Sequence, residues 1–289
     1  MIYNTASIIG VGLIGGSLAR AFKHYKVCTR VTGISRSDAY KRARNAGIID
    51  DGYPITELER ALENADLIVL AMPIVEIIKI MRRVFAAAPY GSTITDVGST
   101  KSAIMESALS CSTADSTFIG GHPMAGSEKT GFEAGSHDLF RKRPYVLIKP
   151  DQAPQENFDK LYTAVEKIGA IPQVIDAGTH DTIVAGISQW PQLVAIGLMN
   201  VIGRRNEVES RYYDLCGPAF LEMTRIAASD YSIWEEILST NTKNIETFMK
   251  EFILELKKMK TSIGDSSMKE YFKSANLFRE CLVEAERNR

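Results

Sequence analysis

SIIGVGLIGGS, residues 7–17, is the stretch that decides the fold of this 289-residue chain. It begins as a buried strand and runs into a glycine-rich turn, and a helical pattern follows it. A second strand pattern, at residues 30–34, arrives at the spacing of a βαβ unit. The stretch therefore predicts the start of a dinucleotide-binding fold.

Each glycine of this turn has an expected task. Gly10 makes the tight turn, Gly12 lets the backbone approach a pyrophosphate, and Gly15 lets the helix pack closely on the strand. Leu13 and Ile14 open the helix, and that end of a helix presents free N–H groups to phosphates. We expect these five residues to bind the cofactor. The alternative is a structural strand-to-helix turn that binds no ligand.

Apolar runs with helical patterns between them continue through the first part of the chain. They lie at residues 7–9, 30–34, 67–71, 93–95, 117–119, 144–148 and 172–175. This alternation predicts a mostly parallel sheet covered on both faces, the α/β doubly wound sheet of a Rossmann-type domain. Thr56 and Glu59 form a capping-box pattern for a short helix, and residues 74–87 are periodic in the manner of a helix.

Strand patterns stop after Asp176, and the rest of the sequence is helical. We expect helices at residues 180–203, 218–228, 233–260 and 268–289, with Thr179 as an N-cap. The predicted domains are 1–176, a dinucleotide-binding domain, and 177–289, an all-α substrate and dimerisation domain. The long helical segments are apolar nearly all round, which predicts that a second subunit covers one face in a homodimer.

The composition excludes several classes of protein. Lys and Arg together number 34 against 35 Asp and Glu, which leaves no basic surface for nucleic acid or an acidic membrane. Four scattered cysteines predict neither a zinc site nor a disulfide framework, and we expect no metal. We expect no leader before the first strand and no apolar run long enough to span a membrane. A cytoplasmic protein with a small-molecule substrate is expected.

The end of the second strand bears on the choice of cofactor. An acidic residue there binds the adenosine ribose and rejects the 2′-phosphate of NADP. This chain has Ser35, Arg36 and Ser37 at that place, and hydroxyls with a guanidinium suit a phosphate. NADP is therefore the preferred cofactor, and NAD is the alternative if Asp38 binds the ribose. Further cofactor contacts are expected from Met72, Pro73, Gly98 and Ser99.

Three later segments combine small residues with titratable groups. They are DVGSTK at residues 96–101, GGHPMAGSEK at 120–129 and FLEMTRIA at 220–227. The first two follow predicted strands, and ligands of open α/β sheets bind outside the carboxyl ends of the strands.

Together with the opening glycine turn, these segments resemble the prephenate and arogenate dehydrogenase family of tyrosine biosynthesis. The resemblance spans Gly10 to about Trp234 and is to the form without an ACT domain. It implies that hydride leaves ring C4 of prephenate for NAD(P)⁺ with loss of CO₂, which gives 4-hydroxyphenylpyruvate.

The resemblance also implies roles for particular residues. His122 is the catalytic base for the C4 hydroxyl, Ser99 holds that hydroxyl, and Arg225 clamps a substrate carboxylate. Glu128, Lys129 and Trp234 line the substrate site. The His180-Asp181 pair matches a family pair, but we expect His180 to face solvent in a first helical turn and give it no catalytic role.

Each role has a structural alternative. His122 could be a satisfied turn residue, Ser99 the cap of a helix that starts near Lys101, and Arg225 an ion-pair partner of Glu222. Trp234 is as easily explained by packing.

One departure from the family affects the substrate. Many members carry Ser-His-Leu-Pro-His in the first helical segment, where this chain reads SQWPQ at residues 188–192. Gln192 replaces a histidine with a neutral amide, which can accept from the ammonium of arogenate. Arogenate dehydrogenase is therefore one alternative function. Two others are another Rossmann-type hydroxy acid dehydrogenase with a catalytic lysine, and a catalytically silent nucleotide-sensing regulator.

Overall fold

A computed structural model describes residues 1–113, 115–126 and 129–287. Eight strands form one sheet in the order β3-β2-β1-β4-β5-β6-β7-β8, and every neighbouring pair is parallel except β6 with β7. The strands are β1 Tyr3–Ile9, β2 Cys28–Ser35, β3 Asp51–Pro54, β4 Leu67–Leu70, β5 Thr93–Asp96, β6 Thr117–Pro123, β7 Pro144–Ile148 and β8 Ile171–Val174. The predicted α/β doubly wound sheet is confirmed.

Helices cover both faces of this sheet. They are α1 Leu13–His24, α2 Ala39–Asn45, α3 Leu58–Leu62, α4 Ile74–Ala87, α5 Ser102–Cys111 and α6 Gln155–Lys167. Successive residues of a strand point to opposite faces, so Ile8 joins one apolar core with α1 and α6 while Ile9 joins the other with α4 and α5. The short 3₁₀ helices η1 Ile55–Glu57 and η2 Phe132–Ala134 lie in the connections.

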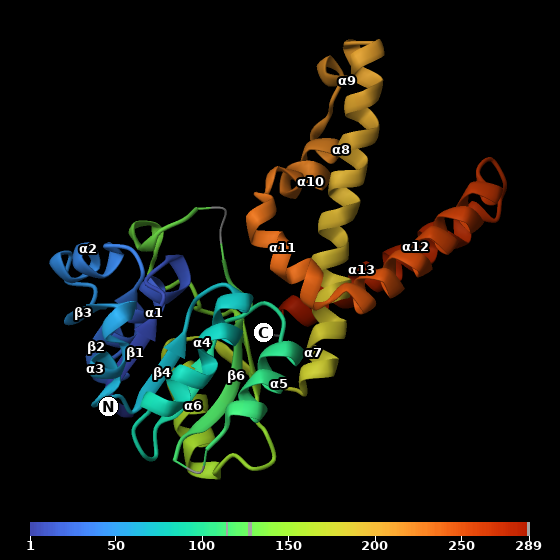
Figure 1. The fold of residues 1–289 in the computed structure, drawn as a ribbon. Coiled ribbons are helices and arrows are strands. Elements are labelled where there is room, and N and C mark those ends of the chain that lie inside the picture. The colour runs from blue at the N-terminus through green and yellow to red at the C-terminus, as the bar shows by residue number, and fades with distance from the viewer. Residues whose placement is uncertain (114, 127–128, 288–289) are drawn as a thin grey trace.

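The second half is helical, as predicted. Its elements are α7 Ala177–Val184, the π-helical η3 Ala185–Gln189, α8 Trp190–Val208, α9 Arg211–Asp214, α10 Pro218–Thr224, η4 Arg225–Ala228, α11 Tyr231–Thr240, α12 Thr242–Ser262 and α13 Met268–Arg287. Figure 1 shows α8, and the pair α12 and α13, projecting away from the sheet.

Three local predictions are wrong. The edge strand β3 has the sequence DGYP and carries no apolar run, so periodicity missed it. Thr56 and Glu59 make no capping box, because η1 precedes α3 and Glu59 instead binds Arg83. Asp176, not Thr179, is the N-cap of α7, and its carboxylate accepts from the Thr179 N–H at 2.9 Å.

A break at Asn241 divides the single helix expected at residues 233–260 into α11 and α12. The Asn241 backbone leaves the helical region at φ −130° and ψ 22°. Its side chain donates to the Asp181 carbonyl and to Oε1 of Gln189, each at 2.7 Å. These bonds tie the start of α12 to the α7–α8 helical run.

Large apolar side chains of the helical half are exposed. Val208 is 89% exposed, Leu215 81% and Phe278 70%. By length and composition alone the continuous helical run Ala177–Val208 is apolar enough to cross a membrane, so the expectation that no run reaches that length is wrong. The run nevertheless carries four buried polar side chains, His180, Asp181, Gln189 and Gln192, which bond other parts of the chain.

Candidate active site

The glycine turn after β1 leaves space for a ligand. Gly10 has φ +104°, and a Cβ there would collide with the Ala71 carbonyl oxygen. Gly12 is the N-cap residue of α1, no side chain caps that helix, and a Cβ on Gly12 would meet no atom within 4 Å. Leu13 and Ile14 follow, half-buried, in the first turn of α1. An open space against uncapped helix N–H groups fits a pyrophosphate.

The residues expected at the adenosine end lie on both sides of this turn. Ser35 ends β2, and its hydroxyl lies 3.2 Å from that of Ser37. The Arg36 guanidinium lies 3.0 Å from Glu76 in the first turn of α4. Asp38 stands at the start of α2, 3.6 Å from Arg42 of the same helix. An arginine and two hydroxyls, with no carboxylate among them, therefore stand at the end of β2.

A cavity of about 350 Å³ lies where the sheet meets the helical half. It brings together three residues predicted for the site, Ser99 after β5, His122 in β6 and Trp234 in α11. Its other described lining residues are Pro123, Met124, Ala125, Gly126, Val184, Ser188, Gln189 and Ile237. The cavity thus has a titratable group from the sheet, and the helices add both apolar side chains and the polar Ser188 and Gln189.

The remaining predicted substrate residues do not line this cavity in the described part of the chain. Gln192 is buried one helical turn beyond Gln189, and its Nε2 donates to the Ile226 carbonyl at 2.8 Å. Arg225 is exposed at the start of η4, next to that carbonyl, and Lys129 is exposed in the loop after β6. Glu128 lies outside the described residues.

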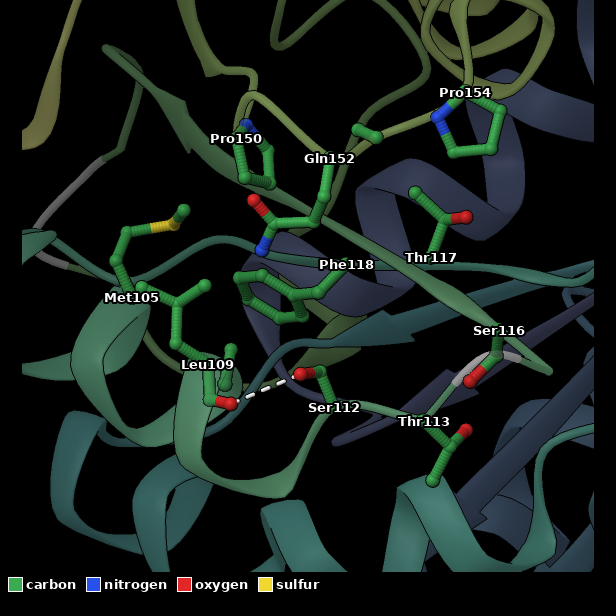
Figure 2. A pocket seen from close by; sticks show the side chains of 12 residues that line it. Met105, Leu109, Ser112, Thr113, Ser116, Thr117, Phe118, Pro150, Gln152 and Pro154 are labelled. Carbon is green, nitrogen blue, oxygen red and sulfur yellow. Dashed lines mark hydrogen bonds between the residues drawn. The ribbon is translucent and has the colours of Figure 1, made fainter.

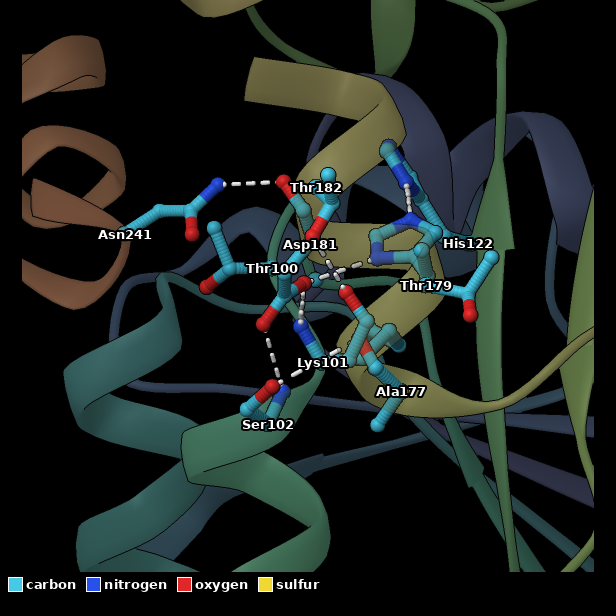
Figure 3. Close-up of polar contacts among 12 residues, drawn as sticks. Thr100, Lys101, Ser102, His122, Ala177, Thr179, Asp181, Thr182 and Asn241 are labelled. Carbon is cyan, nitrogen blue, oxygen red and sulfur yellow. Dashed lines mark hydrogen bonds and ion pairs between the residues drawn. The ribbon is translucent and has the colours of Figure 1, made fainter. Parts of the chain in front are cut away.

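His122 is linked to a second histidine and an aspartate. Its Nδ1 lies 2.8 Å from Nε2 of His180, whose Nδ1 lies 2.8 Å from Oδ1 of Asp181. His180 is fully buried, so the expectation that it faces solvent is wrong. Figure 3 shows His122 and Asp181 among these contacts, together with Lys101 and Ser102. We call His122, His180 and Asp181 the histidine relay.

Asp181 fixes the proton positions along the histidine relay. Burial raises the pKa of Asp181, but hydrogen bonds from His180, from Ser102 and from the backbone outweigh it and bring the pKa below its ordinary value. The ionised carboxylate can only accept, so His180 Nδ1 donates to it. The His180 Nε2 is then an acceptor, and His122 Nδ1 donates to that atom. The lone pair of His122 is therefore on Nε2.

The same surroundings keep His122 neutral. Burial, the Lys101 charge and the His180 ring lower the pKa of His122 well below 6.5, against a smaller opposing effect of Asp181. A neutral imidazole with a free Nε2 is the form that accepts a proton from a substrate hydroxyl. This arrangement has the chemistry that a general base requires.

Asp96 and Lys101 hold the loop that carries Ser99 against the end of β6 that carries His122. Asp96 accepts the N–H of Gly98 at 2.8 Å and that of Gly121 at 3.0 Å. Lys101 is fully buried, pairs closely with Asp96 and donates to the Gly121 carbonyl at 2.8 Å. Gly121 is required here, because a Cβ would collide with the Asp96 carbonyl oxygen. The buried ion pair therefore fixes the distance between the Ser99 loop and the end of β6 that carries His122.

The start of α5 receives its cap from another helix. The Asp181 carboxylate accepts the backbone N–H groups of Lys101 at 2.7 Å and Ser102 at 2.8 Å. Ser99 makes no side-chain cap there, so the alternative that Ser99 caps this helix is wrong. In the sequence, His180 and Asp181 appear only as two polar residues at the start of an apolar helix. Local periodicity cannot tell which side of such a helix packs against the rest of the protein.

A second cavity, of about 290 Å³, lies beside α5 at the start of β6, the strand that carries His122 near its other end (Figure 2). Met105 and Leu109 of α5, Phe118 near the start of β6, and Pro150 and Gln152 are among its lining residues. None of its described lining residues is titratable. Of these two cavities, the one that contains His122 is therefore the candidate for chemistry.

Comparison with known proteins agrees with this architecture. The family model of the prephenate dehydrogenase nucleotide-binding domain matches residues 18–174, and that of the prephenate dehydrogenase dimerization domain matches residues 176–277. The prephenate dehydrogenase of Lactococcus lactis subsp. cremoris is 32% identical over 271 residues, 92% of this chain and 73% of the relative. The cyclohexadienyl dehydrogenase of Zymomonas mobilis is 28% identical over 284 residues, 96% of each chain.

A solved structure extends the likeness to three dimensions. Prephenate dehydrogenase from A. aeolicus, in complex with hydroxyphenyl propionate and NAD⁺, has a TM-score of 0.89 and 25% identity to this chain, over 96% of this chain and 98% of that one. Because the nucleotide-binding and dimerization models follow one another along the sequence and the relatives match nearly the whole chain, the protein belongs to the prephenate dehydrogenase family.

Proposed function

We propose that this protein catalyses the NAD(P)-dependent oxidative decarboxylation of prephenate to 4-hydroxyphenylpyruvate. The observation that carries the proposal is the histidine relay, in which His122 Nδ1 lies 2.8 Å from His180 Nε2 while His122 and Ser99 line the same cavity between the two halves. Residues 1–176 form the nucleotide-binding domain in this proposal, and residues 177–289 the helical substrate and dimerisation domain.

Each group has a task in this reaction. When bound, NAD(P)⁺ accepts the hydride that leaves C4 of the substrate. His122 Nε2 takes the proton of the C4 hydroxyl, while Ser99 holds that hydroxyl and Asp181, through His180, holds the imidazole. Loss of CO₂ then makes the ring aromatic, and the proton returns to the oxygen on C4. The chain thus provides a base and an orienting hydroxyl in this proposal.

The cofactor turn fits this assignment. Gly10, Gly12, Leu13, Ile14 and Gly15 surround the pyrophosphate in our proposal, since the space beside Gly12 is open and the α1 N–H groups are uncapped. Met72 and Pro73, which lead from β4 into α4, and Gly98 and Ser99 after β5 complete the contacts.

Arogenate is the second candidate substrate, because this chain has the neutral amide of Gln192 where many family members carry a histidine. Gln192 Nε2 donates to the Ile226 carbonyl, and the side chain is buried outside the lining of the His122 cavity, so Gln192 would act on the substrate only through its neighbours. Absorbance at 340 nm with each substrate, tested against NAD⁺ and NADP⁺, decides between them. If neither substrate yields reduced cofactor, the proposed function is wrong.

A homodimer located in the cytoplasm is part of the proposal. Large apolar side chains are exposed along α8, α12 and α13, such as Val208 and Phe278, and a second subunit would cover them in our proposal. The dimerization-domain model matches these helices. The sedimentation coefficient of the purified protein measures the assembly.

Arg225 is proposed to clamp a substrate carboxylate. We expect Arg225→Lys to raise KM by about tenfold or more while kcat changes less, because a lysine cannot make the two parallel bonds of a guanidinium. The matched control is Arg211→Lys in α9, an exposed arginine paired with Glu209 at 2.6 Å. Steady-state kinetics and circular dichroism measure the effect. Unchanged KM in the folded variant would make Arg225 structural.

We propose that NADP⁺ is preferred over NAD⁺, because Ser35, Arg36 and Ser37 stand at the end of β2. The double variant Ser35→Asp with Arg36→Ala should move the preference to NAD⁺ by about a hundredfold, since it removes a phosphate partner and adds a repulsive carboxylate. The ratio of kcat/KM for the two cofactors in both proteins measures this. A parent enzyme that already favours NAD⁺ would contradict the proposed preference.

A further inference from the structure

An ion pair crosses the sheet edge at the adenosine end of the cofactor site. Arg36 follows β2, and Glu76 lies in the first turn of α4, which follows β4. The strands β2 and β4 are the two neighbours of β1, and the glycine turn leaves the carboxyl end of β1 between them. The 3.0 Å contact between Arg36 and Glu76 therefore spans the place where the adenosine ribose of a dinucleotide binds.

Glu76 is shared by two cations. Its Oε2 contacts Arg36, and its Oε1 accepts from Lys79, one helical turn on, at 3.1 Å. The hydrogen bond from Lys79 and the charges of Lys79 and Arg36 outweigh partial desolvation and keep the pKa of Glu76 below its ordinary value. The Glu76 side chain is 25% exposed, whereas those of Arg36 and Lys79 are 60% and 66% exposed. The cations are thus open to a ligand, and the carboxylate between them is more enclosed.

We propose that Glu76 is a specificity-determining residue, which competes with the 2′-phosphate of NADP⁺ for Arg36 and thereby keeps NAD⁺ usable. The inference rests on the proposed role of Arg36 in binding that phosphate. With NAD⁺ the Arg36–Glu76 pair stays closed. With NADP⁺ the guanidinium turns from a carboxylate to a phosphate, and the Glu76 charge is left close to the phosphate.

The variant Glu76→Gln removes the charge and keeps the size and the acceptor oxygen of the side chain. We expect 2′,5′-ADP, which carries the phosphate that distinguishes NADP, to bind this variant about tenfold more tightly than the parent. Binding of 5′-ADP should change by less than about twofold, because no charge of that ligand faces Glu76. Isothermal titration measures both, and the gain should shrink at about 0.5 M KCl, where exposed charges are screened.

The matched control is Glu57→Gln. Glu57 also forms an exposed ion pair with an arginine, Arg60, at 3.0 Å. Glu57→Gln changes the net charge of the protein by the same amount as Glu76→Gln. This control should leave the binding of both nucleotides unchanged. In an Arg36→Ala background, the gain in affinity for 2′,5′-ADP caused by Glu76→Gln should be at least halved, because Glu76 and the phosphate no longer compete for Arg36.

Three results would overturn the inference. Glu76→Gln could bind 2′,5′-ADP no more tightly than the parent, or it could bind both nucleotides more tightly by the same factor. The third such result is a gain in 2′,5′-ADP affinity that is as large in the Arg36→Ala background as in the parent. The kinetic counterpart is a rise of about tenfold in kcat/KM for NADP⁺ with little change for NAD⁺. Nucleotide binding requires no turnover. Failure to oxidise prephenate or arogenate would therefore count against the proposed function, and the titrations would still decide the role of Glu76.

Discussion

His122→Asn should lower kcat by about two to four orders of magnitude with a smaller change in KM, because a general base acts mainly in the transition state. Asparagine keeps a polar side chain in β6 but has no lone pair of comparable basicity. Steady-state kinetics with the preferred substrate and cofactor measure the loss. Cofactor affinity should be retained, because the residues of the glycine turn after β1 do not line the His122 cavity.

A second histidine variant controls for general damage. His137→Asn changes an exposed histidine that stacks on His24 at 4.0 Å, outside the His122 cavity. This control should keep kcat within about twofold of the parent value, since surface changes away from a site have small effects. Near-normal turnover of His122→Asn would remove His122 from the mechanism, whatever the control shows.

Most of the sheet could be predicted from the sequence because its signals are local. The strands around Ile8, Val69 and Leu147 are short apolar runs, and the turn at Gly10 requires a positive φ that glycine adopts without strain. The edge strand β3 has no such run. Its pairing with β2 comes from the tertiary fold, which periodicity cannot report.

The cavity was predicted only in part. Ser99 and His122 carry motifs at strand ends, and the parallel sheet brings those ends to one edge. His180 becomes the partner of His122 because α7 packs against the start of α5, with Asp181 as its cap. That contact joins residues about 80 positions apart in the chain, and no spacing rule predicts it.

The long helices show the same limit. Asn241 ends one helix and starts another because its side-chain amide donates hydrogen bonds to the Asp181 carbonyl and to Oε1 of Gln189. A helical pattern that continues on both sides of Asn241 gives no reason to expect a break. The ion pair between Arg36 and Glu76 likewise could not be predicted from the sequence, because the two residues meet only when the start of α4 lies near the end of β2 in the fold.

Asp181→Asn should lower kcat by about a hundredfold, the second largest loss that we expect. The amide that this substitution introduces can donate to His180 Nδ1, which moves the His180 proton to Nε2. His180 would then donate to His122 Nδ1, and the His122 proton would move to Nε2, the atom that must accept from the substrate. The variant therefore presents the wrong tautomer of His122, although no substrate contact is lost.

The pH profile separates this effect from simple loss of structure. Asp181 is the group that opposes the lowering of the His122 pKa, so its neutralisation should lower that pKa further. His122 acts as a base in its neutral form, and activity falls only as the pH drops through its pKa. The acid limb of kcat/KM, already well below pH 6.5 in the parent, should therefore move to lower pH in Asp181→Asn while the plateau falls.

Helix capping provides the control for Asp181→Asn. Asp181 also caps α5, so the variant should lose stability as well, by about 1–3 kcal/mol. Asp176→Ala removes the cap of α7 without touching the histidine relay, and it should lower stability by about 1 kcal/mol with kcat unchanged. If Asp181→Asn lost stability but kept kcat and its acid limb, Asp181 would be a helix cap alone, and the tautomer of His122 would have to be fixed by the substrate.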